Sequence, residues 1–195
     1  MIERHHANPH VERLIVERWS PRSFDGSDIP QADLDVILEA GGWAPSSYNV
    51  QPWRFLYARR GDDNWERFQA LLIEGNRKWA RDASVLIVIV SDTMQRRADT
   101  VSPSHTHSFD AGAAWQNMAL QATAMGYHAH GMIGLDIPRA MAELGIPDDF
   151  RVEAAVVIGR RDDKDKLPES LREREFPSGR KPVSEFAFAG DFPSG

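Results

Sequence analysis

The sequence predicts an α+β domain in which helices flank a mixed central sheet. The first observation is a continuous, β-branched run over residues 84–90, which is typical of a strand buried on both faces. The second is that helical and strand-like segments alternate irregularly, which fits α+β better than a doubly wound fold. The third is the length of 195 residues, which suits one domain with a sizeable core.

The elements can be placed in order along the chain. Apolar residues at helical spacing predict a short helix over residues 10–18, and Pro30 suits the first turn of a helix that Gly41 and Gly42 end. The remaining predicted elements are a strand over 55–57, an amphipathic helix over 63–74, the central strand, a helix over 110–126, a strand over 128–133, a helix over 138–144 and a strand over 152–158.

Two segments indicate a subunit interface. The helix over residues 110–126 carries alanine, Trp115, Met118 and Leu120 on nearly every side, so it must be buried all round. A chain this short rarely achieves that alone. Residues 160–195 are charged and lack a core of their own, but their isolated phenylalanines favour packing on a neighbouring surface over disorder. We therefore expect a single domain over residues 1–159 with a C-terminal extension over residues 160–195.

Composition argues against several classes of function. The net charge of -6 is unsuited to a nucleic-acid surface, and no apolar run approaches the ~20 residues of a membrane span. The absence of cysteine excludes disulfides, thiolate metal sites and a cysteine nucleophile. The N-terminus lacks the order of a signal peptide, so we expect a cytoplasmic protein. The sequence contains neither G-x-G-x-x-G nor G-x-S-x-G, which weakens a Rossmann or hydrolase assignment.

Arg18, Ser20 and Arg22 are candidate ligands for a phosphate. They occupy alternate positions just after the first predicted helix, and alternate side chains of an extended segment share one face. Two guanidinium groups and a hydroxyl match a phosphomonoester well. The competing interpretation is a solvated basic turn. Arg180 and Lys181 form a second basic pair in the tail, which by itself is more typical of surface charge.

The loop over residues 43–55 interrupts the regular pattern with two prolines, serines and asparagine, and tryptophans flank it. Prolines prevent a helix there, and the Ser and Asn side chains are left to bind something. This composition predicts a rigid pocket wall for a flat ligand with polar edges.

Together these motifs resemble the nitroreductase family of FMN-dependent oxidoreductases. The resemblance covers essentially the whole chain, in order. It rests on Arg18-x-Ser20-x-Arg22-x-Phe24, Pro45-Ser46-Ser47-x-Asn49-x-Gln51-Pro52-Trp53, Asn76 ahead of the central strand, Asp110-x-Gly112-x-Ala114, Gly131-Met-Ile-Gly134-Leu-Asp136, the strand over 155–159 and Arg180-x-Pro182.

The resemblance implies an intertwined homodimer with FMN at two interface sites and with the C-terminal extension wrapped around the partner subunit. It also implies the roles of individual residues. Arg18, Ser20, Arg22 and Arg180 would hold the FMN phosphate and ribityl chain, and Lys181 could take the place of Arg180. Asn76 would bind the pyrimidine edge of the flavin, and the backbone around Ile133 and Gly134 would face N5. Pro45, Ser46, Ser47 and Asn49 would come from the other subunit and pack beside the ring.

The implied reaction is the reduction of an electron-poor small-molecule acceptor by NADH or NADPH. Hydride would pass through the flavin in a ping-pong cycle, with nitroaromatics and quinones as plausible acceptors and no acid–base or nucleophilic residue required. Three alternatives stay open. One is other flavin chemistry known among relatives, namely flavin fragmentation, dehalogenation or enal reduction. The second is a non-catalytic flavin-binding protein, and the third is a metal-dependent hydrolase.

The sequence departs from the family pattern beside the predicted flavin. Trp79 stands where a lysine is common, with Arg77 and Lys78 adjacent, so the source of positive charge near flavin N1 is open. The histidines carry the hydrolase alternative, because His105-x-His107 and His128-x-His130 each place two imidazoles on one face of an extended chain. No carboxylate stands at a ligand spacing from them. We therefore predict no metal site, with the first pair at the pocket mouth and the second at a strand edge near the flavin.

Overall fold

The structure, a computed structural model, describes residues 7–193. Residues 1–6, in which we expect no signal peptide, lie outside the described residues, as do residues 194 and 195. No helix within the described range is long and apolar enough to cross a bilayer.

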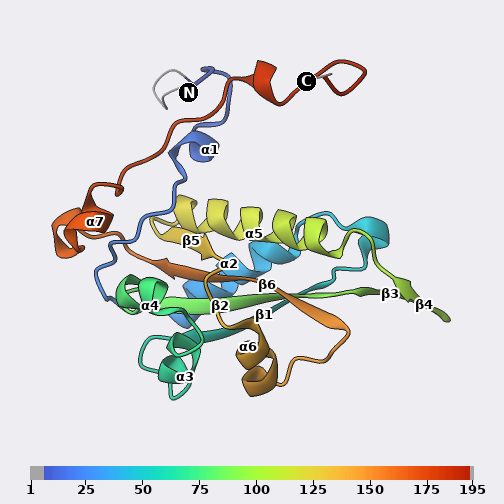
Figure 1. The fold of residues 1–195 in the computed structure, drawn as a ribbon, viewed down its shortest axis with the longest axis horizontal. Helices are drawn as coiled ribbons and strands as arrows, with labels where there is room; N and C mark the ends of the chain where they lie inside the picture. The colour runs from blue at the N-terminus through green and yellow to red at the C-terminus, as the bar shows by residue number, and fades with distance from the viewer. Residues whose placement is uncertain (1–6, 194–195) are drawn as a thin grey trace.

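A four-stranded sheet forms the centre of the described chain (Figure 1). Its strand order is β1 (Trp53–Arg59), β2 (Val85–Asp92), β6 (Phe150–Gly159) and β5 (His128–Met132). The α+β class is confirmed, but the neighbouring strands of this sheet pair antiparallel, so the sheet is not mixed. Strand direction depends on how the connecting segments cross the sheet, and the residue pattern within a strand does not encode that crossing.

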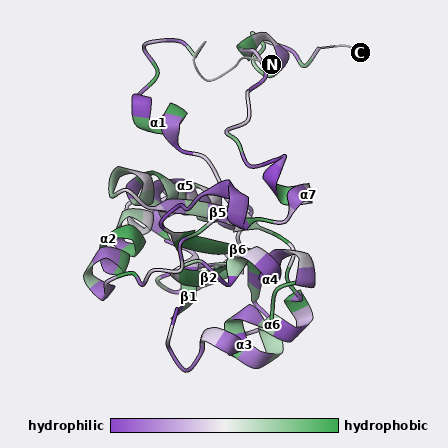
Figure 2. Cartoon of the chain, turned by 90° about the vertical axis from the view of Figure 1, so that its left-hand side faces the viewer, coloured by the Kyte–Doolittle hydropathy of each residue, from purple (hydrophilic) through white to green (hydrophobic). Residues whose placement is uncertain are grey.

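The central strand β2 is buried along its whole length, as its apolar run predicts. Leu86, Val88 and Val90 enter one core cluster, and the alternate residues Val85, Ile87 and Ile89 enter another. Because successive side chains of a strand point to opposite faces, β2 needs a layer of helices on each side. Figure 2 shows hydrophobic strands in the centre and, around them, helices that combine hydrophilic and hydrophobic residues.

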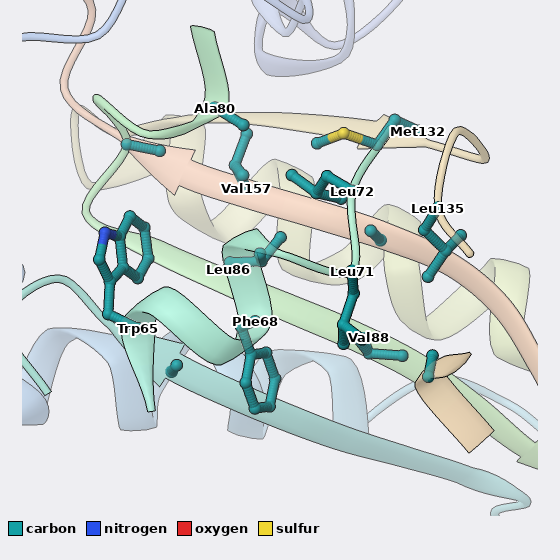
Figure 3. Packing of buried hydrophobic residues seen from close by; sticks show 14 of the residues in the cluster. Trp65, Phe68, Leu71, Leu72, Ala80, Leu86, Val88, Met132, Leu135 and Val157 are labelled. Carbon is teal, nitrogen blue, oxygen red and sulfur yellow. The ribbon is translucent and has the colours of Figure 1, made fainter. Parts of the chain in front are cut away.

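Two layers of helices cover the sheet. On one face lie α2 (Gln31–Gly42) and α5 (His107–Ala124). On the other lie α3 (Trp65–Gln69), α4 (Glu74–Ala80) and α6 (Ile137–Leu144). Figure 3 shows Trp65, Phe68 and Leu72 packed against the side chains of the sheet in this second layer.

Two regions differ from their predicted structure. The helix predicted over residues 63–74 is two helices, α3 and α4, because Leu71 and Leu72 leave the helical path to pair with the chain near Leu135. The polar stretch after β2 forms a hairpin of β3 (Met94–Arg97) and β4 (Thr100–Pro103), and α5 then begins at His107. The helical spacing of apolar residues in the sequence does not reveal that Leu71 and Leu72 pair with a distant segment instead of continuing the helix.

The two ends of the described chain extend away from this body on the same side (Figure 1). At the N-terminal end lies α1 (Arg13–Glu17), and the tail contains η3 (Lys164–Lys166), α7 (Glu169–Arg172) and η4 (Val183–Glu185). Leu167 still belongs to the core, whereas Phe186 is 62% exposed and Phe192 is 90% exposed. The tail is thus anchored to its own chain at its start.

The close packing of α2 on α5 gives a testable prediction. A Cβ at Gly41 would lie 2.8 Å from Met118 Cγ and 3.2 Å from the Phe55 ring, and both neighbours are held in the core. We expect Gly41→Ala to lower the free energy of unfolding by about 1–3 kcal/mol, measured by urea denaturation. Gly42→Ala is the matched control, since a Cβ there meets nothing within 4 Å. Equal stability of the two variants would contradict this packing.

Candidate functional site

A basic pocket of about 360 Å³ opens between the N-terminal segment, β5 and the tail. Arg18, Ser20 and Arg22 contribute from the first of these, as their alternation predicts. Arg180 joins them from a position far away in sequence, which brings together the four residues expected around a phosphate. The full lining comprises Arg18, Trp19, Ser20, Arg22, His130, Arg174, Phe176, Ser178 and Arg180.

The electrostatics of this pocket favour an anionic ligand. Arg18 Nη1 donates a hydrogen bond to Ser20 Oγ over 3.2 Å. Burial lowers the pKa of the Arg18 guanidinium, and the positive charge of Arg180 lowers it further. An anion between the two guanidinium groups would offset both effects, because it restores favourable interactions to the charged forms. The arginines of this pocket thus concentrate positive charge, which favours an anionic ligand.

His130 lines the pocket from β5. Its Nδ1 lies 2.9 Å from the Pro21 carbonyl oxygen, and since a carbonyl only accepts, Nδ1–H is the donor. Burial lowers the pKa of His130, and the charge of Arg22 acts in the same direction. The imidazole ring also lies 4.7 Å from the Trp79 ring, centroid to centroid. A neutral imidazole fits a pocket that already concentrates positive charge.

Asn76 and Gly134 lie together at a second position. Asn76 Nδ2 donates to the Gly134 carbonyl oxygen over 3.1 Å, and the same oxygen accepts from the backbone of Ile73. A Cβ at Gly134 would collide with the Asn76 amide, so only glycine allows this approach. The neighbouring Ile133 is 82% exposed. Trp79 is buried at 3% and packs on Phe24, so it adds no charge to this position.

The predicted loop lies at the other end of α5. Ser46, Ser47 and Asn49 belong to the turn that contains η2 (Ser47–Asn49), and Pro45 precedes it on the surface. Tyr48, Asn49 and Gln51 all have positive φ, a conformation that costs of order 1 kcal/mol or more for each non-glycine residue. The strain is held by hydrogen bonds from Ser47 N to Asp110 Oδ2 and from Gln51 N to Ser46 Oγ. Clustered strain of this kind is typical of functional loops.

The predicted residues therefore form three groups within the described chain. The basic pocket holds Arg18, Ser20, Arg22 and Arg180; a second group holds Asn76, Ile133 and Gly134; and the loop holds Pro45, Ser46, Ser47 and Asn49. Lys181 belongs to none of them, because its Nζ lies 3.9 Å from Glu185 on the surface.

Sequence reasoning missed the share of the tail in the pocket. Arg174, Phe176 and Ser178 line it together with Arg180. The signal was available, because these residues stand at alternate positions, just as Arg18, Ser20 and Arg22 do. Without the fold, nothing in the charged tail separates this pattern from a solvated surface.

The four histidines of the hydrolase alternative do not gather into one cluster within the described chain. No group of three or more potential metal ligands occurs among residues 7–193. His107 instead hydrogen-bonds Ser91 Oγ through Nδ1 at 2.8 Å, and Ser91 Oγ donates to Glu153. His128 and His130 lie on β5, which is an edge strand of the described sheet, as predicted.

Comparison with known proteins finds similarity along the chain. The model of the nitroreductase family matches residues 15–160. A crystal structure of an oxidoreductase containing FMN has a TM-score of 0.93 and 48% identity, and covers 99% of both chains. A provisionally assigned nitroreductase of Desulfovibrio desulfuricans, solved in complex with FMN, has a TM-score of 0.72 and 30% identity over 95% of this chain and 99% of that one.

Among sequence relatives, a protein of Archaeoglobus fulgidus has the provisional name NADH dehydrogenase/NAD(P)H nitroreductase. It is 30% identical over 161 residues, which are 78% of this chain and 87% of the relative.

The half-buried His128, which lies against Trp19 of the pocket, gives a prediction on pH. Burial lowers the pKa of His128 below 6.5, and Arg161 lowers it further. At a pH between the two pKa values the unfolded chain therefore binds more protons at His128 than the folded chain. The contribution of His128 to the free energy of unfolding is fully present above about pH 6.5 and is lost as the pH falls below that value. We expect His128→Gln to flatten the loss of Tm between pH 7.5 and pH 5.5. His105→Gln, a change at an exposed histidine, is the control. Parallel pH curves for His128→Gln and the unmodified protein would contradict this assignment.

Proposed function

Because the chain belongs to the nitroreductase family, we propose that it is an FMN-dependent oxidoreductase that uses NADH or NADPH to reduce electron-poor acceptors such as nitroaromatics or quinones. Two similar structures contain FMN, and the name of the Archaeoglobus relative supports a nicotinamide donor. The observation that carries the proposal is the convergence of Arg18, Arg22 and Arg180 on one pocket.

The residues present fit FMN. Arg18, Ser20, Arg22 and Arg180 would hold its phosphate, and the depressed pKa of Arg18 is the feature that a bound anion relieves. His130 lies on β5 in the basic pocket, and Ile133 and Gly134 follow β5 directly. In an extended chain the distance from residue 130 to residue 134 is about 13 Å. A ligand with a phosphate at one end and a polar-edged ring at the other suits this separation. Asn76 would face the ring through its amide.

When bound, FMN supplies hydride transfer between nicotinamide and acceptor, so the chain has to bind, orient and shield it. The arginines orient the phosphate end, while Gly134 lets the backbone and Asn76 approach closely. The exposed Ile133 side chain would exclude water from that side of the ring. Because the flavin would carry out the hydride transfer, the protein itself would need no nucleophile or acid–base pair.

We further propose that the enzyme acts as a cytoplasmic homodimer in which the loop over residues 45–49 serves the partner's flavin. Three features support this arrangement. The loop packs on the first turn of α5 at Asp110, and none of its residues lines the basic pocket of its own chain. Trp115 and Leu120 of α5 are only half-buried within the described chain, although the sequence predicts burial all round over residues 110–126, and Phe109 in the first turn of the helix is 80% exposed. Trp43 and Phe186 are also large apolar side chains left exposed.

The first test is anaerobic reduction of the purified protein. We expect a yellow protein whose flavin absorbance bleaches on addition of NADH or NADPH and returns when a quinone or nitroaromatic is added. Stopped-flow absorbance near 450 nm, the flavin band, measures both half-reactions. A colourless protein would exclude the proposed function, and a yellow protein that neither donor bleaches would leave only a flavin carrier.

The second test concerns the arginines. Replacing Arg18 and Arg22 by alanine removes two charge-assisted contacts, each worth about 1.5–3 kcal/mol, so FMN affinity should fall by about 3–6 kcal/mol in the double variant. Fluorescence titration measures the Kd. Arg67→Ala is the control, because Arg67 lies over Phe68 on α3, outside the basic pocket. Unchanged FMN affinity in the double variant would remove both arginines from the site.

A further inference from the structure

The tail forms one wall of the basic pocket, and one buried carboxylate fixes that wall. Beyond α7, Arg174, Phe176, Ser178 and Arg180 line the pocket, whereas Glu175 does not. Glu175 is turned into the body, and its side chain is 3% exposed. Within this short segment, the pocket-lining side chains and the side chain of Glu175 therefore point in different directions.

Glu175 binds the opposite wall at the base of Arg22. Its Oε1 accepts hydrogen bonds from the backbone N–H groups of Arg22, over 2.6 Å, and of Ser23, over 3.0 Å. Its Oε2 lies 3.7 Å from Arg22 Nη1 and has no hydrogen-bond partner among the described residues. The carboxylate of this tail residue is thus held by the backbone of the N-terminal segment at Arg22 and Ser23. Hydrogen bonds to an ionised acceptor in a buried position are among the stronger ones in proteins.

No residue after Glu175 is buried in the described part of the tail. Upstream, Leu167 anchors the chain in the core, but Ser178 and Arg180 lie beyond that anchor. Glu175 is therefore the last buried residue of the described tail, and it stands immediately before the part that carries Ser178 and Arg180. The Arg180 side chain donates within its own turn, to Ser178 and the Gly179 carbonyl, while its backbone takes part in an isolated β-bridge.

We propose that Glu175 is a positioning residue for phosphate binding, which latches the tail onto the segment of Arg22 so that both walls close on one phosphate. Arg18, Ser20 and Arg22 act from one wall, and Arg174, Ser178 and Arg180 act from the other. The two backbone hydrogen bonds to Oε1 of Glu175 carry this positioning role, and Oε2 lies 3.7 Å from Arg22 Nη1. This inference rests on the proposed function, because FMN is the phosphate carrier in question.

The test compares FMN with riboflavin, which has the same ring system but no phosphate. The full-length protein, freed of flavin, is titrated with each by fluorescence. Glu175→Ala should raise the Kd for FMN at least tenfold and change that for riboflavin less than twofold. Glu175→Gln should stay within threefold of the unmodified protein for FMN, because an amide oxygen still accepts from both backbone N–H groups.

The matched control is Glu173→Ala, a change at an exposed carboxylate two residues earlier in the tail, which should leave both Kd values unchanged. An unchanged FMN Kd in Glu175→Ala overturns the proposal. An equal loss of FMN and riboflavin also overturns it, since that pattern indicates a general structural role.

Arg174→Ala and Ser178→Ala provide an independent measurement should Glu175→Ala not fold, as judged by circular dichroism. Both side chains are on exposed residues, so both variants should fold and weaken FMN, but not riboflavin, at least threefold. No effect from either overturns the proposal. Unmodified protein that binds neither flavin overturns the proposed function instead.

Discussion

The burial of β2 on both faces is the constraint on which the rest of the structure depends. A strand with apolar side chains on both sides is stable only between two layers, so α2 and α5 cover one face and α3, α4 and α6 cover the other. β6 fills the position beside β2 and leaves β5 at the sheet edge. The candidate site lies at that edge because β5 carries both His130 and the approach to Gly134.

The shape of the basic pocket depends on electrostatic and polar contacts, whereas the core depends on the burial of apolar side chains. It brings together guanidinium groups from Arg18, Arg22, Arg174 and Arg180, and like charges in a partly buried site disfavour one another. The segments that carry them contribute little to the core themselves. The pocket therefore needs specific polar contacts to hold its shape, and the Glu175 carboxylate supplies two of them. An anion that binds between these guanidinium groups would relieve part of their mutual repulsion, which favours binding.

The sequence predicts most elements because their signals are local. The β2 run and the glycines that end α2 need no knowledge of the fold, and the alternation of Arg18, Ser20 and Arg22 places them in one pocket. The antiparallel sheet, the break between α3 and α4, and the wall at Arg174 and Ser178 were not predicted. Each depends on which distant segment lies beside it, as Leu72 beside Leu135 shows. Glu175 was missed for the same reason, because its partners are backbone groups, which carry no residue signature.

The order of strands in the sheet also has a consequence for biosynthesis. β2 ends at Asp92, whereas its neighbour β6 begins only at Phe150, so the most apolar strand leaves the ribosome well before half of its hydrogen-bonding partners exist. Pairing over such a separation is slow, and an unpaired apolar strand is prone to aggregate. β1, already synthesised, protects one edge of β2 in the meantime. The other edge of β2 therefore stays unpaired until the chain through α5 and α6 has been synthesised.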